Sequence, residues 1–347
     1  MHNNNYNLLR LLFAVAVIYS HSFELLGFPD PLERMSSAMS AGTIGVCGFF
    51  LLSGYLTAQS WSHEPLALAF LKKRALRLYP AFIVASALSV LVVGPLGAST
   101  QHYFAEWSPY KFVADLIGLR QPRTPAVFAG SPVQSVNGAM WTITFELRCY
   151  LLLTVLGLCG VVKRRWALLL LAVAVNVAAI LGAPHQRGAE GLPLFGVSGF
   201  MIWFASMYLS GVCFYAFRER IPLRASLAAV AFIVFVAALF GPQSVLRAVT
   251  STMGAYLILY CGQLQSSWLA KLRMRDDISY GLYLYGWPVM QLTAHWLPSI
   301  VPLVAFTCVT AMCIPLALAS WRRIEAPALR LKRATVPRGN LALGRLR

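Results

Sequence analysis

Residues 166–183 read WALLLLAVAVNVAAILGA and carry no charged side chain, whereas Lys163, Arg164 and Arg165 precede them directly. A helix of roughly 20 apolar residues is long enough to cross the hydrocarbon core of a bilayer. Similar runs recur along the whole chain. We therefore predict about ten membrane-spanning helices, near residues 8–27, 42–60, 78–97, 138–160, 166–183, 198–217, 223–241, 245–264, 278–296 and 299–321.

The composition favours the same class of protein. Of the 347 residues, 58% are hydrophobic and 12% are charged, whereas about a quarter are charged in a soluble domain. This excludes a soluble globular domain, a disordered chain and a small secreted disulfide scaffold. The formal net charge of +17 would suit a nucleic-acid partner. We expect none, because the basic residues stand in short loops between apolar runs.

The distribution of charge predicts the orientation in the membrane, because cytoplasmic loops carry an excess of Lys and Arg. With the N-terminus in the cytoplasm, the basic loops at 72–77, 163–165, 218–224 and 271–275 lie inside together with the C-terminal tail. Together with Arg10 and with the acids Glu64, Asp276 and Asp277 on the same side, these segments account for the whole net charge of +17, and the outer loops are neutral. We thus predict an all-α, polytopic membrane bundle with both termini cytoplasmic.

The cysteines do not indicate disulfides or metal binding. All of them lie inside apolar segments or at their ends, and no pair has a metal-ligand spacing such as Cys-x-x-Cys. We interpret them as small buried apolar residues and expect no metal site. They are Cys47, Cys149, Cys159, Cys213, Cys261, Cys308 and Cys313.

One predicted outer loop, at about 98–137, is longer than the others. It contains several prolines and the stretch YFAEWSPYKFVADLIGL, a candidate interfacial helix. Long loops in compact proteins are commonly functional or disordered. The segment could bind an acceptor or act as a lid, or it could be a plain interfacial element, and the sequence leaves both open.

Charged and titratable side chains within spans are costly and are therefore functional candidates. The first span contains Arg10 and His21, which share one helix face at a separation of about 16 Å along the axis. A cation near the cytoplasmic end and a proton-transfer group deeper in the same groove suit a substrate that enters from the cytoplasm. The alternative is a snorkelling arginine and a packed histidine.

The fourth span contains Glu146, which we place at the same depth as His21. A carboxylate beside a histidine increases its basicity and fixes its tautomer, so we expect the two side chains to be paired. Tyr150 lies one turn from Glu146 on the same face, and Arg148 points the other way. The alternative for Glu146 is a structural ion pair with an arginine of another span. For Arg148, a structural ion pair and a role in binding phosphate are both open.

Arg74 and Arg77 in the second inner loop are three residues apart and hence on one helix face. Arginine suits bidentate contacts with phosphate, so the two could hold phosphates at the cytoplasmic mouth of a cavity. As basic residues of an inner loop, they could equally serve only to orient the chain.

Two further stretches combine polar and aromatic side chains within the membrane. GFFLLSGYL contains Ser53, and ISYGLYLYGWPVMQ contains Ser279 and Tyr283. Small residues also let helices pack closely, and tyrosines also form aromatic belts. We nevertheless include these three residues, with Trp141 of the fourth span, among the candidate substrate contacts.

Together these segments resemble the membrane-bound acyltransferase-3 family of bacterial cell-surface O-acyltransferases. The matches are spread over nearly the whole chain, in the right order and on the right spans. They are Arg10-x10-His21, GTIGVCGFFLLSGYL, Arg74-x-x-Arg77-Leu-Tyr-Pro80, Trp141-x4-Glu146-x3-Tyr150 and ISYGLYLYGWP.

The resemblance implies a transmembrane acyltransferase domain over residues 1–327 and a basic cytoplasmic tail over 328–347. It also implies acyl-CoA as the donor, with no required metal or other cofactor. In this family the first-span arginine and histidine are the hallmark functional pair, which here are Arg10 and His21. The chain departs from the family at Gly286, where many members have a histidine, so no role for a second histidine is transferred.

We therefore predict an O-acyltransferase embedded in the lipids of the bacterial cytoplasmic (inner) membrane. It would move an acyl group, which we expect to be acetyl, from cytoplasmic acyl-CoA to a hydroxyl of a surface polysaccharide or lipid-linked glycan precursor on the outer side. The competing class is a proton-coupled transporter of an anionic small molecule, which also holds charged side chains inside a helical bundle. The predicted catalytic residues are His21 and Glu146, and the predicted acyl-CoA contacts are Arg10, Arg74, Arg77, Arg148 and Tyr150.

Overall fold

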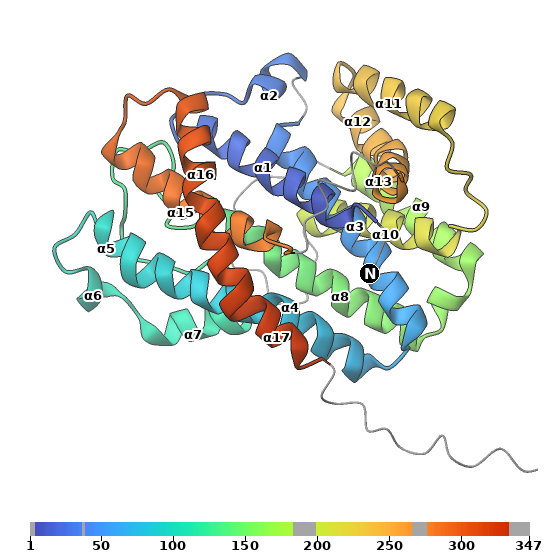
Figure 1. Ribbon diagram of the computed structural model, residues 1–347, viewed down its shortest axis with the longest axis horizontal. Coiled ribbons are helices and arrows are strands. Elements are labelled where there is room, and N and C mark those ends of the chain that lie inside the picture. Colours follow the sequence, from blue (N-terminus) through green and yellow to red (C-terminus); the bar gives the residue numbers. More distant parts are fainter. Residues whose placement is uncertain (1–3, 37–38, 183–198, 266–275, 333–347) are drawn as a thin grey trace, which may run out of the picture.

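The computed structural model describes residues 4–36, 39–182, 199–265 and 276–332. Over these ranges the chain folds into helices, and it contains no β-strand there beyond one isolated bridge. Figure 1 shows the helices gathered into one bundle. The predicted all-α fold is therefore confirmed.

The described α-helices are joined in places by short turns of π or 3-10 pitch. The π turns are η1 (Ser89–Val93), η4 (Thr250–Gly254) and η5 (Trp321–Glu325), and the 3-10 turns are η2 (Gly138–Thr142) and η3 (Val161–Lys163). The α-helices are α1 (Tyr6–Glu24), α2 (Pro31–Ser36), α3 (Ala41–His63), α4 (Ala67–Leu88), α5 (Gly94–Leu96), α6 (Tyr103–Glu106), α7 (Pro109–Ile117), α8 (Ile143–Leu158), α9 (Arg165–Leu181), α10 (Gly199–Ala216), α11 (Ala225–Leu239), α12 (Gln243–Val249), α13 (Ala255–Gln263), α15 (Ser279–Trp296), α16 (Pro302–Ser320) and α17 (Ala326–Arg330).

By length and composition, seven helices in the described part of the chain could cross a membrane. Helices α9 and α11 are apolar but shorter, and α15 lies where the ninth span is predicted. A multi-pass membrane protein is thus confirmed, whereas the count of ten spans and the cytoplasmic termini stay predictions. The seven are Tyr6–Glu24, Ala41–His63, Ala67–Leu96, Gly138–Leu158, Gly199–Ala216, Gln243–Gln263 and Pro302–Arg330.

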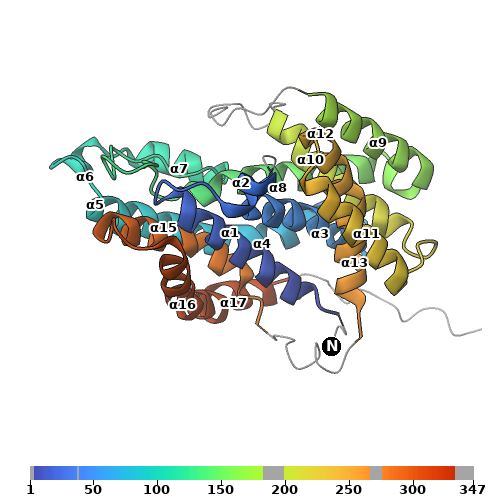
Figure 2. The same cartoon turned by 90° about the horizontal axis from the view of Figure 1, so that it is seen from above.

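Helix α3 packs against both α1 and α10 inside the bundle (Figure 2). Two glycines allow α3 and α10 to approach closely. A Cβ atom on Gly54 would lie 2.0 Å from the carbonyl oxygen of Tyr208, and one on Gly211 would lie 2.0 Å from that of Leu51. Small residues at such a contact let two backbones meet without a side chain between them, which fixes the position of α3 and of the side chains it carries.

Helices α16 and α17 form one long rod that crosses the front of the bundle in Figure 1. The π turn η5 joins them, directly before the Ala326–Pro327 step. Pro327 has no backbone N–H to continue the α-helical ladder, so the turn before it widens. This turn contributes Glu325, which is 2% exposed and accepts a hydrogen bond of 3.1 Å from Ser320 Oγ.

The long segment predicted at 98–137 packs against the bundle as a small structured unit. It contains helices α6 and α7 and an antiparallel bridge between Ala98 and Val127. The guanidinium of Arg123 binds the buried carboxylate of Asp115, with an Nη2–Oδ1 distance of 2.8 Å. These contacts hold the segment in one shape, and they are compatible with both of its predicted roles.

The contact between α3 and α10 yields a prediction for stability. Gly54→Ala should lower the free energy of unfolding by about 1–3 kcal/mol, because the new methyl group meets backbone that cannot move aside. The control is Gly254→Ala, where the nearest atom beyond the local helix backbone, Thr250 Cγ2, would be 3.7 Å from the Cβ. Thermal melting of the purified protein in detergent measures both variants, and equal melting temperatures would contradict the packing account.

Candidate active site

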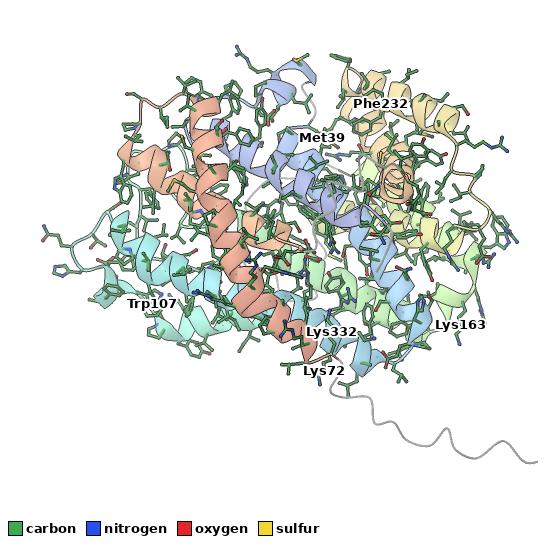
Figure 3. The ribbon with its side chains drawn as sticks, viewed as in Figure 1. Met39, Lys72, Trp107, Lys163, Phe232 and Lys332 are labelled. Carbon is green, nitrogen blue, oxygen red and sulfur yellow. The ribbon has the colours of Figure 1, made fainter. Side chains whose placement is uncertain are left out.

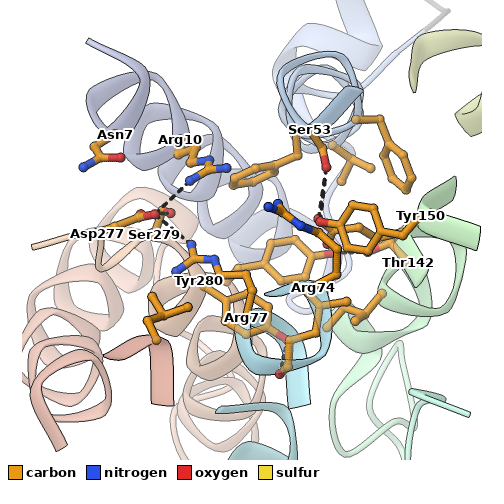
Figure 4. A pocket seen from close by; sticks show the side chains of 18 of the residues that line it. Asn7, Arg10, Ser53, Arg74, Arg77, Thr142, Tyr150, Asp277, Ser279 and Tyr280 are labelled. Atoms are coloured by element: carbon orange, nitrogen blue, oxygen red, sulfur yellow. Dashed lines mark hydrogen bonds and ion pairs between the residues drawn. The ribbon is translucent and has the colours of Figure 1, made fainter. Parts of the chain in front are cut away.

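A cavity of about 510 Å³ lies between α1, α3, α4, α8, α15 and the α16–α17 rod. It lies towards the end of the bundle where α1, α4 and α15 begin, which is the end predicted to face the cytoplasm. Figure 4 shows polar side chains from several of these helices converging on it. The predicted site residues that line it are Arg10, Ser53, Arg74, Arg77, Glu146, Tyr150, Ser279 and Tyr283.

One carboxylate connects three of the helices around the cavity. Oδ2 of Asp277, directly before α15, accepts from Arg77 Nη2 of α4 at 2.7 Å and from Arg10 Nη1 of α1 at 3.0 Å (Figure 4). Its other oxygen, Oδ1, accepts a hydrogen bond of 2.5 Å from Ser279 Oγ. Arg77 also lies 3.5 Å from Glu325 of η5. This network fixes Arg10 and Arg77 at the wall of the cavity.

The surroundings of Asp277 keep it ionised. Burial alone would raise the pKa of its carboxyl group, but the charges of Arg77 and Arg10 and the hydrogen bond from Ser279 outweigh burial and hold the pKa at about 2. A folded-state pKa below the ordinary value means that the carboxylate stabilises the fold fully above about pH 4 and loses this contribution as the pH falls through about 2. The network is therefore constant at neutral pH.

Arg74 differs from the other two arginines of the cavity. Its Nη2 donates to Ser60 Oγ at 3.2 Å, and its guanidinium lies over the rings of Phe70 and Tyr150, 5.4 and 5.8 Å from their centres. Its Nε is buried without a hydrogen-bond partner in the described part of the chain, and no described carboxylate lies within ion-pair distance. Arg74 can therefore bind an anion that enters the cavity.

Glu146 and Tyr150 form a second polar group in the cavity, next to Arg74. The Tyr150 hydroxyl donates a short hydrogen bond to Glu146 Oε1. Ser53 Oγ on α3 lies 3.3 Å from that carboxylate oxygen and 3.2 Å from the Tyr150 hydroxyl. Glu146 thus orders the cavity wall between α3 and α8.

The expected pairing of Glu146 with His21 is wrong in this structure. His21 Nδ1 lies 3.3 Å from Oε2 of Glu24, one turn further along α1, and the His21 ring packs edge-on against Trp287 with 4.5 Å between ring centres. His21 is not among the side chains that line the cavity. The two predicted catalytic residues belong to separate sites because equal depth in the membrane does not define which way a side chain points around its helix.

Two other candidates lie away from the cavity. Trp141 packs among aromatic side chains, with its ring 4.8 Å from that of Phe200 and 5.7 Å from that of Phe145. Arg148 is 8% exposed, and its guanidinium lies 5.2 Å from the centre of the Phe145 ring. Neither lines the cavity, so their expected role in binding substrate is not supported by their position.

Three charged residues of these sites were not predicted from the sequence. Asp277 and Lys332 line the cavity. In the sequence they were only two of the charged residues used to predict the orientation, Asp277 in an inner loop and Lys332 in the C-terminal tail. Glu24 was counted only as an outer-loop acid. The available signal was the spacing: an acid three residues after His21, and an acid directly before the ISYGLYLYGWP stretch. Lys271, Arg273 and Arg275 of the inner loop, and the tail beyond residue 332, lie outside the described residues.

Comparison with known proteins gives consistent matches along the chain. Residues 3–322 match a family model described as an acyltransferase domain. The chain is 30% identical over 367 residues to nodulation protein 10 of Rhizobium leguminosarum bv. viciae, covering 97% of this chain and 96% of that protein. It is 26% identical over 339 residues to an O-acetyl transferase of Shigella phage Sf6, covering 94% and 96% of the two chains. No solved structure matches.

The network around Asp277 predicts that removing the charge of Asp277 destabilises the protein much more than removing the charge of its neighbour Asp276. Asp277→Asn should destabilise the protein by about 3–5 kcal/mol, because it leaves two largely buried guanidinium groups without their shared counter-charge. Asp276→Asn is the matched control: its partner Arg322 has a side chain that is 69% exposed, and exposed pairs contribute about 0–1 kcal/mol. Melting of both variants in detergent is the measurement, and an unchanged Asp277→Asn melt would show that the network does not hold the helices.

Proposed function

This chain belongs to the acyltransferase family that its motifs resemble, and it is a membrane O-acyltransferase; from this premise we propose its donor, its acceptor and the direction of transfer. The donor is cytoplasmic acyl-CoA, with acetyl as the expected acyl group. The acceptor is a hydroxyl of a surface polysaccharide or lipid-linked glycan precursor on the outer side of the bacterial inner membrane. No metal or other cofactor takes part.

The observation that carries the proposal is the separation of two chemically different sites along α1. The cavity holds Arg10, Arg74 and Arg77 near the start of α1 and α4. His21 lies about 16 Å further along the axis of α1. Phosphate groups suit the arginine-rich cavity, and a histidine suits proton transfer to and from a hydroxyl. An anionic donor and a hydroxyl acceptor approaching from opposite ends would use the two sites together.

His21 is the proposed catalytic residue, and Glu24 is a positioning residue that acts through it. When Nδ1–H donates to the Glu24 carboxylate, Nε2 is left as the basic nitrogen. As general base, Nε2 takes the acceptor's hydroxyl proton while the oxygen attacks the thioester carbonyl, the C–S bond breaks, and the CoA thiolate leaves with a proton returned from the imidazolium. A transient acyl-histidine is the alternative route.

Tyr283 and Trp287 stand between the two sites, one turn apart on α15. Tyr283 lines the cavity, and its hydroxyl is hydrogen-bonded to Thr142 Oγ1 at 2.5 Å. Trp287 packs against His21. We infer that the acyl end of the donor passes this pair to reach His21, while the phosphates stay with the arginines.

The acceptor side of the proposal rests on the end of the 98–137 segment. Trp287 Nε1 donates to the carbonyl oxygen of Ser135 at 3.1 Å, and Gln291 Nε2 donates to that of Val133 at 2.7 Å. These bonds hold the segment against α15 beside the tryptophan that contacts His21. Of its two predicted roles, this position favours binding of the acceptor.

Steady-state kinetics in proteoliposomes test the assignment of residues. His21→Ala should lower acetyl transfer from acetyl-CoA to the glycan by roughly 100-fold or more. Glu24→Gln should lower kcat by about tenfold with little change in the KM for acetyl-CoA, because it disturbs the histidine and leaves the donor cavity intact. Glu146→Gln should mainly raise that KM, because Glu146 lines the cavity.

The control is Glu33→Gln, since Glu33 is exposed on α2, and its kinetics should match those of the wild type. Wild-type kcat in His21→Ala would remove the histidine from the mechanism. Equal kcat losses in Glu24→Gln and Glu146→Gln would contradict the separation into a donor site and a histidine site. Uptake of acetyl-CoA without release of free CoA would instead indicate a transporter.

A further inference from the structure

Lys332 brings an additional cation to the donor cavity from the far end of the chain. It follows α17 and lines the cavity together with Leu329 of that helix and Trp321 of η5. Figure 3 shows it at the end of the α16–α17 rod. From the sequence alone it is one of several basic residues in a tail, whereas its position makes it part of the cavity wall.

The cations that line the cavity fall into two groups. Arg10 and Arg77 share the carboxylate of Asp277. Arg74 and Lys332 have no carboxylate within ion-pair distance among the residues that the structure describes. Positive charge held in a partly enclosed space without a counter-charge is unfavourable, and an anionic ligand removes this cost. The second group is therefore the part of the wall that remains available to bind a ligand.

The largest charges that act on Lys332 are cations on α4 and α1. Burial, followed by the charges on α4 and α1, lowers the pKa of its amino group to about 7. The cavity also holds the carboxylates of Asp277 and Glu146, and each has a partner: Arg77 binds Asp277, and Tyr150 donates to Glu146. Glu325 of η5 is bound by Arg77 as well. The cations that act on Lys332 are Arg74, Arg77, Lys73 and Arg10.

We propose that Lys332 binds a phosphate of the donor together with Arg74, and that it takes up one proton from solution as the donor enters. The ammonium form donates hydrogen bonds to phosphate oxygens, whereas the neutral amine provides no charge, so binding of the anion favours the protonated form. The inference rests on the proposed function in one respect only, namely that the donor carries phosphates.

The experiment is calorimetric titration of the full-length protein in detergent with desulfo-CoA, which keeps the phosphates of CoA and cannot be turned over. Proton uptake is obtained from the binding enthalpy in buffers of different ionisation enthalpy. With a pKa of about 7 in the free protein, the wild type should take up about 0.9 proton per site at pH 8 and about 0.1 at pH 6, and its affinity should fall by about tenfold between pH 6 and pH 8.

Three variants test whether Lys332 is the group that binds the phosphate and takes up the proton. Lys332→Met should bind desulfo-CoA at least about 100-fold more weakly at pH 6, because nearly complete proton uptake at pH 8 requires the ammonium form to bind that much more tightly than a neutral side chain, and it should take up no proton at pH 8. Lys332→Arg keeps the positive charge at both pH values, so it should retain wild-type affinity at pH 6 and lose the proton uptake and the decline in affinity at pH 8. Arg330→Met is the matched control, because Arg330 is exposed and does not line the cavity, and it should behave as the wild type.

The outcomes distinguish this inference from the proposed function. If the wild type binds desulfo-CoA and Lys332→Met binds it equally well with equal proton uptake, Lys332 is not a phosphate ligand and the donor assignment stands. If neither the wild type nor any variant binds desulfo-CoA, the assignment of acyl-CoA as donor is overturned together with this inference. Melting of each variant verifies that it is folded.

Discussion

The carboxylate of Asp277, shared between Arg10 and Arg77, is the interaction on which the site depends. It joins the start of α15 to α1 and α4, and the bond between Arg77 and Glu325 adds the π turn of the α16–α17 rod. Placing charges in an apolar bundle is favourable only when they are paired. The pairing lets several cations gather at one end of the bundle without forcing the helices apart.

The same pairing divides the cations by task. Arg10 and Arg77 are bound by carboxylates of the protein itself, so they shape the wall of the cavity. We propose that Arg74 keeps its charge available for a ligand and that Lys332 gains its charge as an anion enters, so that the cavity attracts a polyanion without a permanent excess of unpaired charge. His21 lies further along α1 and has its own carboxylate, Glu24, so the two tasks that we propose, donor binding and proton transfer, fall on separate sites.

The features that can be read from a single helix were predicted from the sequence. The membrane-spanning helices were found because the thickness of the bilayer sets the length of an apolar run. The motif residues of α1, α3, α4 and α15 were found because they are charged or polar within such runs. Contacts between helices were not predictable, since depth in the membrane leaves the rotation of each helix undefined. For this reason His21 was paired with Glu146, Arg148 was placed with the substrate, and Lys332 was left in the tail. The contact of His21 with Glu24 lies within α1 and could have been predicted from the spacing of three residues.

We propose that acyl groups pass from a donor at the arginine-rich end to an acceptor at the His21 end. A sided assay tests it most directly: proteoliposomes of one protein orientation, with labelled acetyl-CoA supplied on a single side and the glycan acceptor on the other. We expect labelled O-acetyl groups on the glycan only when acetyl-CoA is on the side of the α4 N-terminus, with free CoA released on that same side. Equal labelling from either side, or labelling only when donor and acceptor share a compartment, would contradict it.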